Sequence, residues 1–192
     1  MIGIIASCLA VSVALGPIVV ASTRRRRRMR RHPAPTFVFA DLVGYTALTE
    51  ERGDEAAADV AREFRRAMSA LSRGHGARQI KSMGDGVMIW APDPADAIAI
   101  AAHAVEEVGT RSDLLPVRVG VHTGPAVMRG CDWYGSAVNV AARLAAQADA
   151  NEALVSAATR IAAGGRFAPA LDDRREVALR GVSATVAAWR LA

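Results

Sequence analysis

The sequence predicts an α+β protein with an antiparallel-rich sheet and helices packed on one face of that sheet. Strand-like and helix-like runs follow one another without the strict alternation of a parallel α/β protein. Two apolar runs within residues 79–90 meet at a Gly-Asp-Gly turn, as in a tight antiparallel hairpin. The alternating residues at 117–124 are typical of a strand with one buried face.

The first predicted strand covers residues 36–41, which are mainly apolar and end in Asp41. A helix is expected to begin at Asp54 and to end at the glycines Gly74 and Gly76. The apolar residues of its buried face recur at helical spacing: Val60, Phe64, Met68 and Leu71.

The second predicted helix begins at Asp93 and Pro94, because a capping carboxylate followed by proline favours a helix start. Two strands are then expected on either side of Gly124 and Pro125. The remaining predicted elements are a helix at 136–148, a strand at 152–156, a short helix, and strands at 176–180 and 185–191.

Residues 2–22 carry no charge, and a helix of about 20 residues rises about 30 Å, one hydrocarbon thickness of a bilayer. We therefore expect residues 1–22 to be a transmembrane helix in contact with the membrane through residues 2–21. A polybasic juxtamembrane linker, 23–35, and a folded domain, 36–192, follow. The positive charges come after the apolar run, which predicts a single-pass cell-membrane protein with a cytoplasmic domain. An unusual signal sequence and a misassigned start codon are the alternatives.

The formal net charge of +5 arises in one segment, because seven of the 24 basic residues lie in Arg24–Arg31. Without these seven, 17 basic residues face 19 acidic ones, so the domain has no basic excess that would indicate a nucleic-acid partner. The two cysteines, Cys8 and Cys131, are far apart and form neither a disulfide framework nor a cysteine metal site within one chain.

Two aspartates lie at predicted strand ends: Asp41 ends the first strand, and Asp85 lies in the hairpin turn. Two carboxylates on neighbouring strand ends suit Mg²⁺ or Mn²⁺, which share oxygen ligands with substrate phosphates. Taken singly, an aspartate at either place is more often a strand-end or turn residue. Backbone N–H groups in the following turn are candidates for binding a triphosphate: Leu42, Val43, Gly44, Tyr45 and Thr46.

The third predicted helix carries Asn139 and Arg143, four positions apart and thus on one face. Arginine there can neutralise a phosphoryl oxygen, and asparagine can orient a sugar oxygen. A solvated arginine and a packing asparagine on an amphipathic helix explain the same pattern.

Four segments occur in the order FADLVGYTALTE, IKSMGDGVMIW, VRVGVHTGPAV and DWYGSAVNVAARL. Taken together, they closely resemble the class III nucleotidyl cyclase catalytic domain. The resemblance covers nearly all of residues 36–192 and implies a ferredoxin-like, antiparallel-rich sheet with packed helices.

The resemblance implies two pairs of binding residues. Asp41 and Asp85 match the aspartates that bind two Mg²⁺ or Mn²⁺ ions in each active site. Lys81 and Asp132 match the pair that selects adenine, where guanylate cyclases tend to have glutamate and cysteine. The resemblance therefore indicates the adenylate cyclase type.

Asn139 and Arg143 match the asparagine and arginine that stabilise the transition state in this family. Arg180 stands near the closing strands, where the family often has a lysine that reaches the distal phosphates. His122 is expected to be structural. The short stretch from Val127 to Asp132 implies a compact subunit-swapping arm.

The implied reaction converts ATP to 3',5'-cyclic AMP and pyrophosphate in a homodimer with active sites shared between chains. In such a dimer Lys81 and Asp85, close in sequence, serve different active sites. One alternative is a weak or inactive cyclase homologue that binds a nucleotide. Another is a membrane-tethered dimerisation module that organises partners at anionic lipid.

Overall fold

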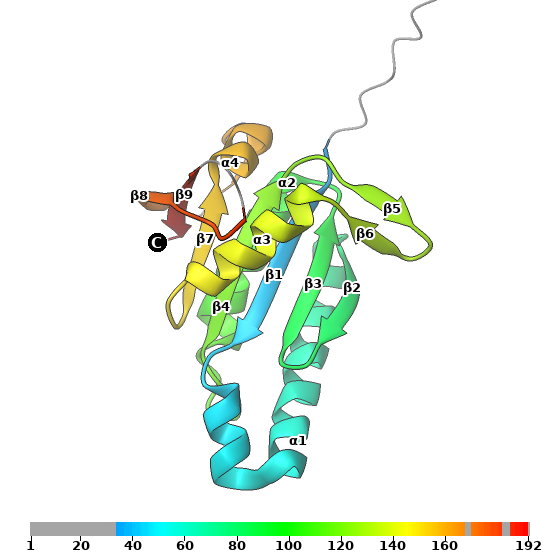
Figure 1. The fold of residues 1–192 in the computed structure, drawn as a ribbon, viewed down its shortest axis with the longest axis vertical. Helices are drawn as coiled ribbons and strands as arrows, with labels where there is room; N and C mark the ends of the chain where they lie inside the picture. Colours follow the sequence, from blue (N-terminus) through cyan, green and yellow to red (C-terminus); the bar gives the residue numbers. More distant parts are fainter. Residues whose placement is uncertain (1–33, 168–169, 182–184, 192) are drawn as a thin grey trace, which may run out of the picture. The chain divides into compact units, whose positions relative to one another are not determined.

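The computed structural model describes residues 34–167, 170–181 and 185–191. A seven-stranded sheet runs in the order β2-β3-β1-β4-β7-β9-β8, and β5 and β6 form a separate two-stranded sheet (Figure 1). The strands are β1 (Thr36–Leu42), β2 (Arg78–Met83), β3 (Gly86–Ala91), β4 (Val117–Thr123), β5 (Val127–Arg129), β6 (Asp132–Tyr134), β7 (Glu152–Ser156), β8 (Leu171–Val177) and β9 (Val186–Leu191).

The large sheet is mixed but mainly antiparallel. The strand β1 lies between β3 and β4 and is antiparallel to both. The strands β4 and β7 pair in parallel, whereas β9 is antiparallel to both β7 and β8. The predicted antiparallel-rich α+β class is therefore confirmed.

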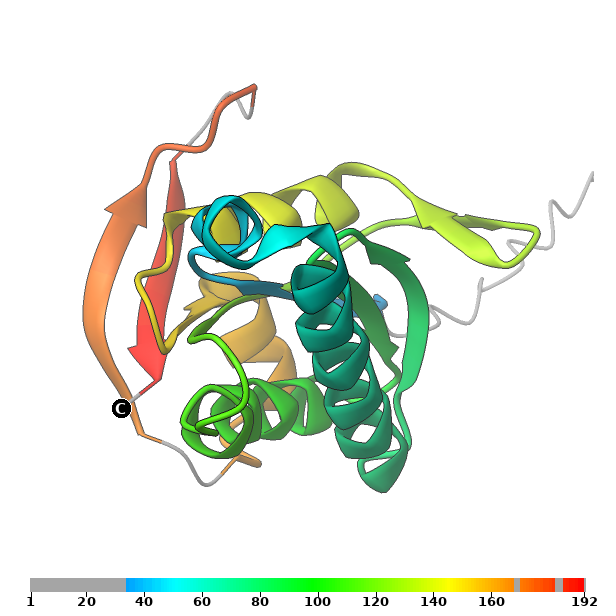
Figure 2. The same ribbon diagram turned by 90° about the horizontal axis from the view of Figure 1, so that it is seen from below.

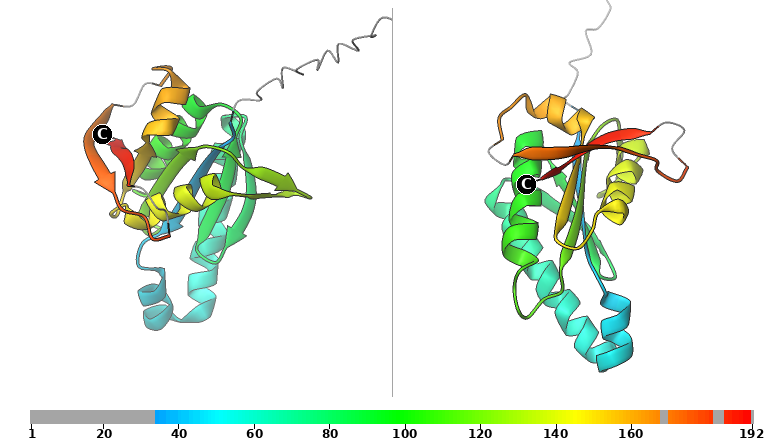
Figure 3. Two further views of the ribbon diagram at one scale, coloured as in Figure 1. Left: turned by 45° about the horizontal axis from the view of Figure 1, so that its top comes forward. Right: turned by 90° about the vertical axis from the view of Figure 1, so that its left-hand side faces the viewer.

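Helices cover both faces of the sheet, which corrects the expectation of helices on one face (Figures 2 and 3). Val38 and Ala40 of β1 pack in the same buried cluster as Phe64 and Met68 of α1. Phe37 and Phe39, which alternate with these residues along β1 and so lie on its other face, pack with α3 instead. Because β1 is apolar at successive positions, each of its two faces needs a helical cover. The helices are α1 (Tyr45–Gly74), α2 (Pro94–His103), η1 (Ala104–Val108), α3 (Ser136–Gln147) and α4 (Ala157–Ala163).

The first helix begins nine residues before the predicted start at Asp54, at Tyr45. Gly53, with φ 82° and ψ 167°, breaks the helical path and leaves a short first segment and a long second one. The prediction found only the second segment. Its buried face is as expected, because Phe64 and Met68 are fully buried.

The strand β8 lies at residues 171–177, whereas the sequence predicted a strand at 176–180. Most of its side chains are exposed and charged, because it is the edge strand beyond β9. An edge strand needs no apolar pattern, so this one escaped detection. The short strand β6 was not predicted either.

The helix α3 lies unusually close to β4 at Gly120. A Cβ atom at this position would lie 2.2 Å from the backbone N of Ala145 and 2.3 Å from the carbonyl O of Ala141. Only glycine allows two backbones to approach this closely. The contact fixes α3 against the centre of the sheet.

The predicted transmembrane helix and polybasic linker lie outside the described residues, apart from Ala34 and Pro35 at the end of the linker. Within the described part of the chain, no helix has the length and apolar character needed to cross a bilayer.

Candidate active site

The structure brings the two predicted metal-binding aspartates together at one end of the sheet. Asp41 pairs with Gly86 across β1 and β3, so it lies beside the turn that carries Asp85. The backbone N–H of Leu42 donates to the carbonyl of Asp85 at 3.3 Å. A Cβ atom at position 86 would lie 3.0 Å from Oδ1 of Asp41, so glycine leaves room for this carboxylate.

Negative charge accumulates at this end of the sheet. The pKa of Asp85 is raised, first by burial and second by the negative charge of Asp41. Arg118 offsets part of this effect and donates to Oδ2 of Asp41 from Nη2 at 2.6 Å and from Nε at 3.1 Å. Two adjacent carboxylates with one guanidinium suit a divalent cation with oxygen ligands. The donor set therefore fits Mg²⁺ or Mn²⁺.

Sequence reasoning missed Arg118 as a site residue. It lies directly opposite Asp41 in the pairing of β1 with β4. Its only sequence signal is a charge in a mainly apolar strand, which also fits an outward-facing side chain. Knowledge of the register between β1 and β4 was needed to place the two together.

A small pocket of about 160 Å³ lies beside Asp41, between the sheet and α3. Met83 and Gly86 from the hairpin contribute to one wall, and Ala142 and Ala146 from α3 contribute to another. Pockets for drug-sized ligands occupy about 300–1,000 Å³. This pocket alone is therefore too small to enclose a nucleotide.

The predicted purine-selecting residues form an ion pair. Nζ of Lys81 on β2 lies 2.7 Å from Oδ2 of Asp132 on β6, although the residues are 51 positions apart. The hydrogen bond from Lys81 is the main cause of the lowered pKa of Asp132. Oδ1 of Asp132 accepts from the backbone N–H of Trp133 at 2.8 Å. A cation and a carboxylate are thus fixed side by side.

The third predicted pair lies on α3, where Asn139 is exposed and Arg143 is partly buried. A Cβ atom on Gly181 would lie 3.3 Å from Nη2 of Arg143, so Arg143 reaches the loop that contains Arg180. Arg180 is exposed. Among the described residues, no carboxylate lies within ion-pair distance of Arg143.

Two of the five predicted phosphate-binding amides have backbone partners within the domain. Leu42 N–H donates to Asp85, and Val43 N–H donates to the carbonyl of Pro116 at 2.8 Å. Gly44, at φ 86°, is the N-cap of α1, and Tyr45 and Thr46 are its first residues. First-turn amides have no partner within their own helix, so those of Gly44, Tyr45 and Thr46 are the remaining candidates.

His122 lies on β4 away from these groups and hydrogen-bonds to Ser156, with 2.9 Å between Nδ1 and Oγ. Burial lowers the pKa of His122 to about 4. A neutral, partly buried imidazole agrees with the expected structural role.

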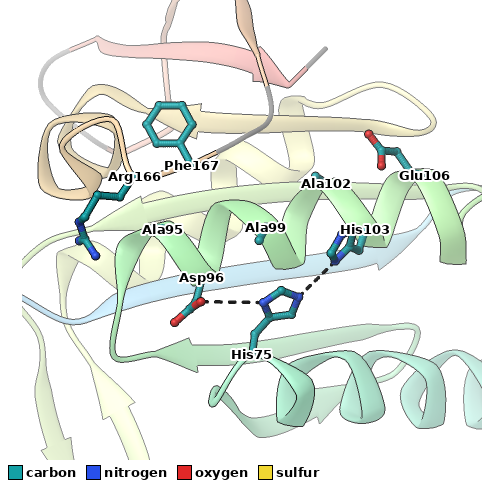
Figure 4. A pocket seen from close by; sticks show the side chains of 9 residues that line it. All are labelled: His75, Ala95, Asp96, Ala99, Ala102, His103, Glu106, Arg166 and Phe167. Atoms are coloured by element: carbon teal, nitrogen blue, oxygen red, sulfur yellow. Dashed lines mark hydrogen bonds and ion pairs between the residues drawn. The ribbon is translucent and has the colours of Figure 1, made fainter.

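A pocket of about 520 Å³ lies beside α2 (Figure 4). Nε2 of His75 and Nδ1 of His103 are 3.2 Å apart, and Asp96 lies 3.9 Å from the other nitrogen of His75. The described residues contain no group of three or more side chains placed to hold a metal ion. None of the predicted site residues lines this pocket.

Comparison with protein families gives a match over residues 28–191 to the adenylate and guanylate cyclase catalytic domain. The pH-sensitive adenylate cyclase MT1302 of Mycobacterium tuberculosis is 38% identical over 132 residues, covering 67% of this chain and 32% of that protein. An adenylate cyclase of Streptomyces griseus is 31% identical over 148 residues, covering 77% of this chain and 36% of that protein. The chain thus spans about a third of the length of these relatives.

Solved structures have the same fold. An adenylate cyclase from Trypanosoma brucei superposes with a TM-score of 0.76 at 23% identity, covering 84% of this chain and 88% of that one. The adenylyl cyclase CyaB from P. aeruginosa superposes with a TM-score of 0.67 at 24% identity, covering 83% of this chain and 94% of that one.

Proposed function

Because the chain belongs to the adenylate and guanylate cyclase catalytic domain family, we propose that it is an adenylate cyclase that converts ATP to 3',5'-cyclic AMP and pyrophosphate. The ion pair of Lys81 with Asp132 carries this proposal. Adenine presents a ring-nitrogen acceptor beside an amino donor, whereas guanine presents an oxygen acceptor in place of that amino group. Lysine only donates and an ionised aspartate only accepts, so the pair matches adenine when Lys81 faces the ring nitrogen and Asp132 faces the amino group. Guanine, whose ring N–H lies beside an oxygen acceptor, would need the reverse order.

Asp41 and Asp85 are proposed to hold two Mg²⁺ or Mn²⁺ ions, with the remaining ligands supplied by substrate and water. When bound, such ions would activate the ribose 3'-hydroxyl and neutralise the pyrophosphate leaving group. In the absence of these ions, Nη2 of Arg118 lies 2.6 Å from Oδ2 of Asp41 and balances the charge of this carboxylate. Once Asp41 binds a cation, the Arg118 guanidinium is free to bind a phosphate oxygen.

Arg143 is proposed to meet the negative charge that grows on the α-phosphoryl group in the transition state. Its guanidinium has no carboxylate partner within the described residues, so it is available for this task. Asn139, one turn earlier on α3, would hold the ribose. Arg180, in the loop beside Arg143, would contact the distal phosphates.

The active site is proposed to be completed by a second copy of the chain. The pocket of about 160 Å³ beside Asp41 is too small for ATP. The small β5–β6 sheet exposes large apolar side chains, and such side chains are enriched at protein interfaces. They are Val127, Met128 and Tyr134, each at least half exposed. In a two-fold dimer each site would combine the aspartates of one chain with Lys81, Asn139 and Arg143 of the other.

The apolar segment 2–21 is proposed to anchor the enzyme in the cell membrane, with the catalytic domain in the cytoplasm. Its support is the uncharged run followed by the arginines at 24–31.

The deciding experiment measures cyclic nucleotide formation by the detergent-solubilised full chain, with Mn²⁺ or Mg²⁺ and either ATP or GTP. We expect cyclic AMP from ATP, and no product from an Asp85→Asn variant. Cyclic GMP as the main product would contradict the adenine assignment. A folded, dimeric protein without product would support a nucleotide-binding or scaffolding role instead.

A further inference from the structure

A groove of about 420 Å³ lies between α1 and β2 and is lined mainly by arginine side chains. Gln79 and Ser82 of β2 line the groove as well, and Nε2 of Gln79 donates to Oγ of Ser82 at 2.9 Å. The arginines all come from the second segment of α1: Arg62, Arg65, Arg66 and Arg73.

The four arginines share one face of the helix. The other three arginines lie three, four and eleven residues after Arg62. At 3.6 residues per turn, side chains at these spacings project in similar directions. At 1.5 Å per residue the stripe is about 16 Å long. A row of guanidinium groups thus forms one side of the groove.

Positive charge exceeds negative charge along this stripe. Arg62 pairs with Asp59 at 2.8 Å, and Arg66 lies 3.8 Å from Glu63. Glu63 is shared, because Arg111 lies closer to it, at 3.0 Å.

Two of the four arginines have no acidic partner. Within the described part of the chain, no carboxylate lies within ion-pair distance of Arg65 or Arg73. Arg73 donates to Oγ of Ser69 at 2.7 Å, and Arg65 donates to the carbonyl of Gly84 at 3.3 Å. Both guanidiniums are therefore available to an anion.

We propose that this groove is a binding site for a small soluble polyphosphate, meaning a ligand with two or more linked phosphate groups. A guanidinium matches phosphate geometry through paired hydrogen bonds, and several in a row match several linked phosphates. The hydroxyl of Ser82, on the β2 side of the groove, adds a hydrogen-bond donor opposite the arginines, which favours a compact ligand held between the helix and the strand. None of the residues assigned to ATP or metal binding lines the groove.

The site is connected to the catalytic hairpin through Arg65. Its hydrogen-bond acceptor, Gly84, directly precedes Asp85 and has φ 63° in the turn. A ligand that draws the Arg65 guanidinium into the groove would remove this support from the turn. Occupancy of the groove would thus be transmitted to a residue proposed to bind metal.

Titration calorimetry with sodium tripolyphosphate tests the site, using the full chain in detergent with EDTA. An Arg65→Gln/Arg73→Gln variant should bind at least tenfold more weakly than wild type. An Arg52→Gln/Arg160→Gln variant loses the same charge at exposed positions elsewhere and should bind within twofold of wild type. Both variants retain Arg24–Arg31 and the proposed catalytic residues. Any tripolyphosphate binding by these residues is therefore the same in both variants. An Arg62→Gln/Arg66→Gln variant repeats the test should the first variant fail to fold.

Equal losses in the groove variant and the control variant would overturn the proposal, because binding would then follow net charge alone. Absence of tripolyphosphate binding by the wild type would overturn it as well. Monomeric dihexanoyl phosphatidylglycerol serves as a lipid-headgroup probe. If the groove variant lost affinity only for this lipid, the soluble polyphosphate would be the wrong ligand.

Discussion

Arg118 and Asp41 face each other across β4 and β1, with Nη2 of the arginine 2.6 Å from Oδ2 of the aspartate. Arg118 provides the counter-charge for the Asp41 carboxylate, which would otherwise lie beside Asp85 without one. In the proposed enzyme, cations and the arginine compete for Asp41. In that proposed enzyme Arg118 would therefore contribute to substrate binding, as would the residues predicted from the sequence.

Replacing Arg118 by alanine should raise the KM for ATP by roughly 10- to 100-fold, the loss expected for a charge-assisted hydrogen bond. Lysine at this position should restore part of the affinity, because it keeps the charge without the planar fork. Steady-state kinetics at saturating Mn²⁺ would measure the KM for ATP of both variants. An unchanged KM would show that Arg118 serves Asp41 alone.

Replacing Asp132 by alanine should lower kcat/KM for ATP by roughly 10- to 100-fold and reduce the preference for ATP over GTP. The change removes the acceptor for the adenine amino group and leaves Lys81 without its partner at 2.7 Å. Asp172→Ala, on the exposed edge strand β8, is the control and should leave the ratio of the two substrates unchanged.

Mixing Asp41→Ala with Arg143→Ala chains should restore activity that neither variant has alone. Random pairing makes half of the dimers mixed, and each mixed dimer has one intact site of two, so about a quarter of wild-type activity is expected. Differently tagged chains allow the mixed dimers to be purified and assayed. Inactive mixed dimers would mean that the sites are not shared.

Stability should fall as pH is lowered from about 6.5 towards 4, partly because of His122. Burial lowers the pKa of this imidazole to about 4, below its ordinary value of 6.5. Between these values the unfolded chain binds a proton that the folded chain does not, so acid favours unfolding. The loss should reach about 1–3 kcal/mol at pH 4 and vanish above pH 7. Urea unfolding of wild type and His122→Gln at pH 7.5 and 5 would test this, and identical pH dependence would exclude His122 as a cause.

Gly120→Ala should destabilise the domain by about 2–3 kcal/mol, because the new methyl group would collide with the α3 backbone. Gly74→Ala is a matched control at the end of α1, where a Cβ meets nothing within 4 Å. Its effect should lie between zero and a gain of about 1 kcal/mol. Thermal unfolding of both variants gives the comparison, and equal melting temperatures would refute the close-contact explanation.

Local patterns predicted those parts of the site that depend on neighbouring residues. The Gly-Asp-Gly turn formed the expected hairpin and placed Asp85 at its tip. The resemblance to a family supplied the link between Lys81 and Asp132, which no local pattern contains. Arg118 was missed because a single charge in a strand does not reveal which neighbour it faces.

The errors in the fold have similar causes. The charged sequence of β8 has no apolar period because a strand at the sheet edge can be solvated on most sides. The first segment of α1 is short and ends at Gly53, so its helical pattern was too brief to detect. The second helical layer could have been inferred from β1, whose successive apolar residues leave neither face suited to water.

The position of β1 between β3 and β4 has a consequence for the folding rate. Asp41 and Arg118 are 77 residues apart in the chain, and their strands pair at the centre of the sheet. Closing loops of this length costs chain entropy before any contact compensates it, so folding should be slow for a domain of this size. The carboxylates of Asp41 and Asp85 meet only when the central strands have paired, so a chain that has formed just its helices and hairpins would lack the proposed metal site.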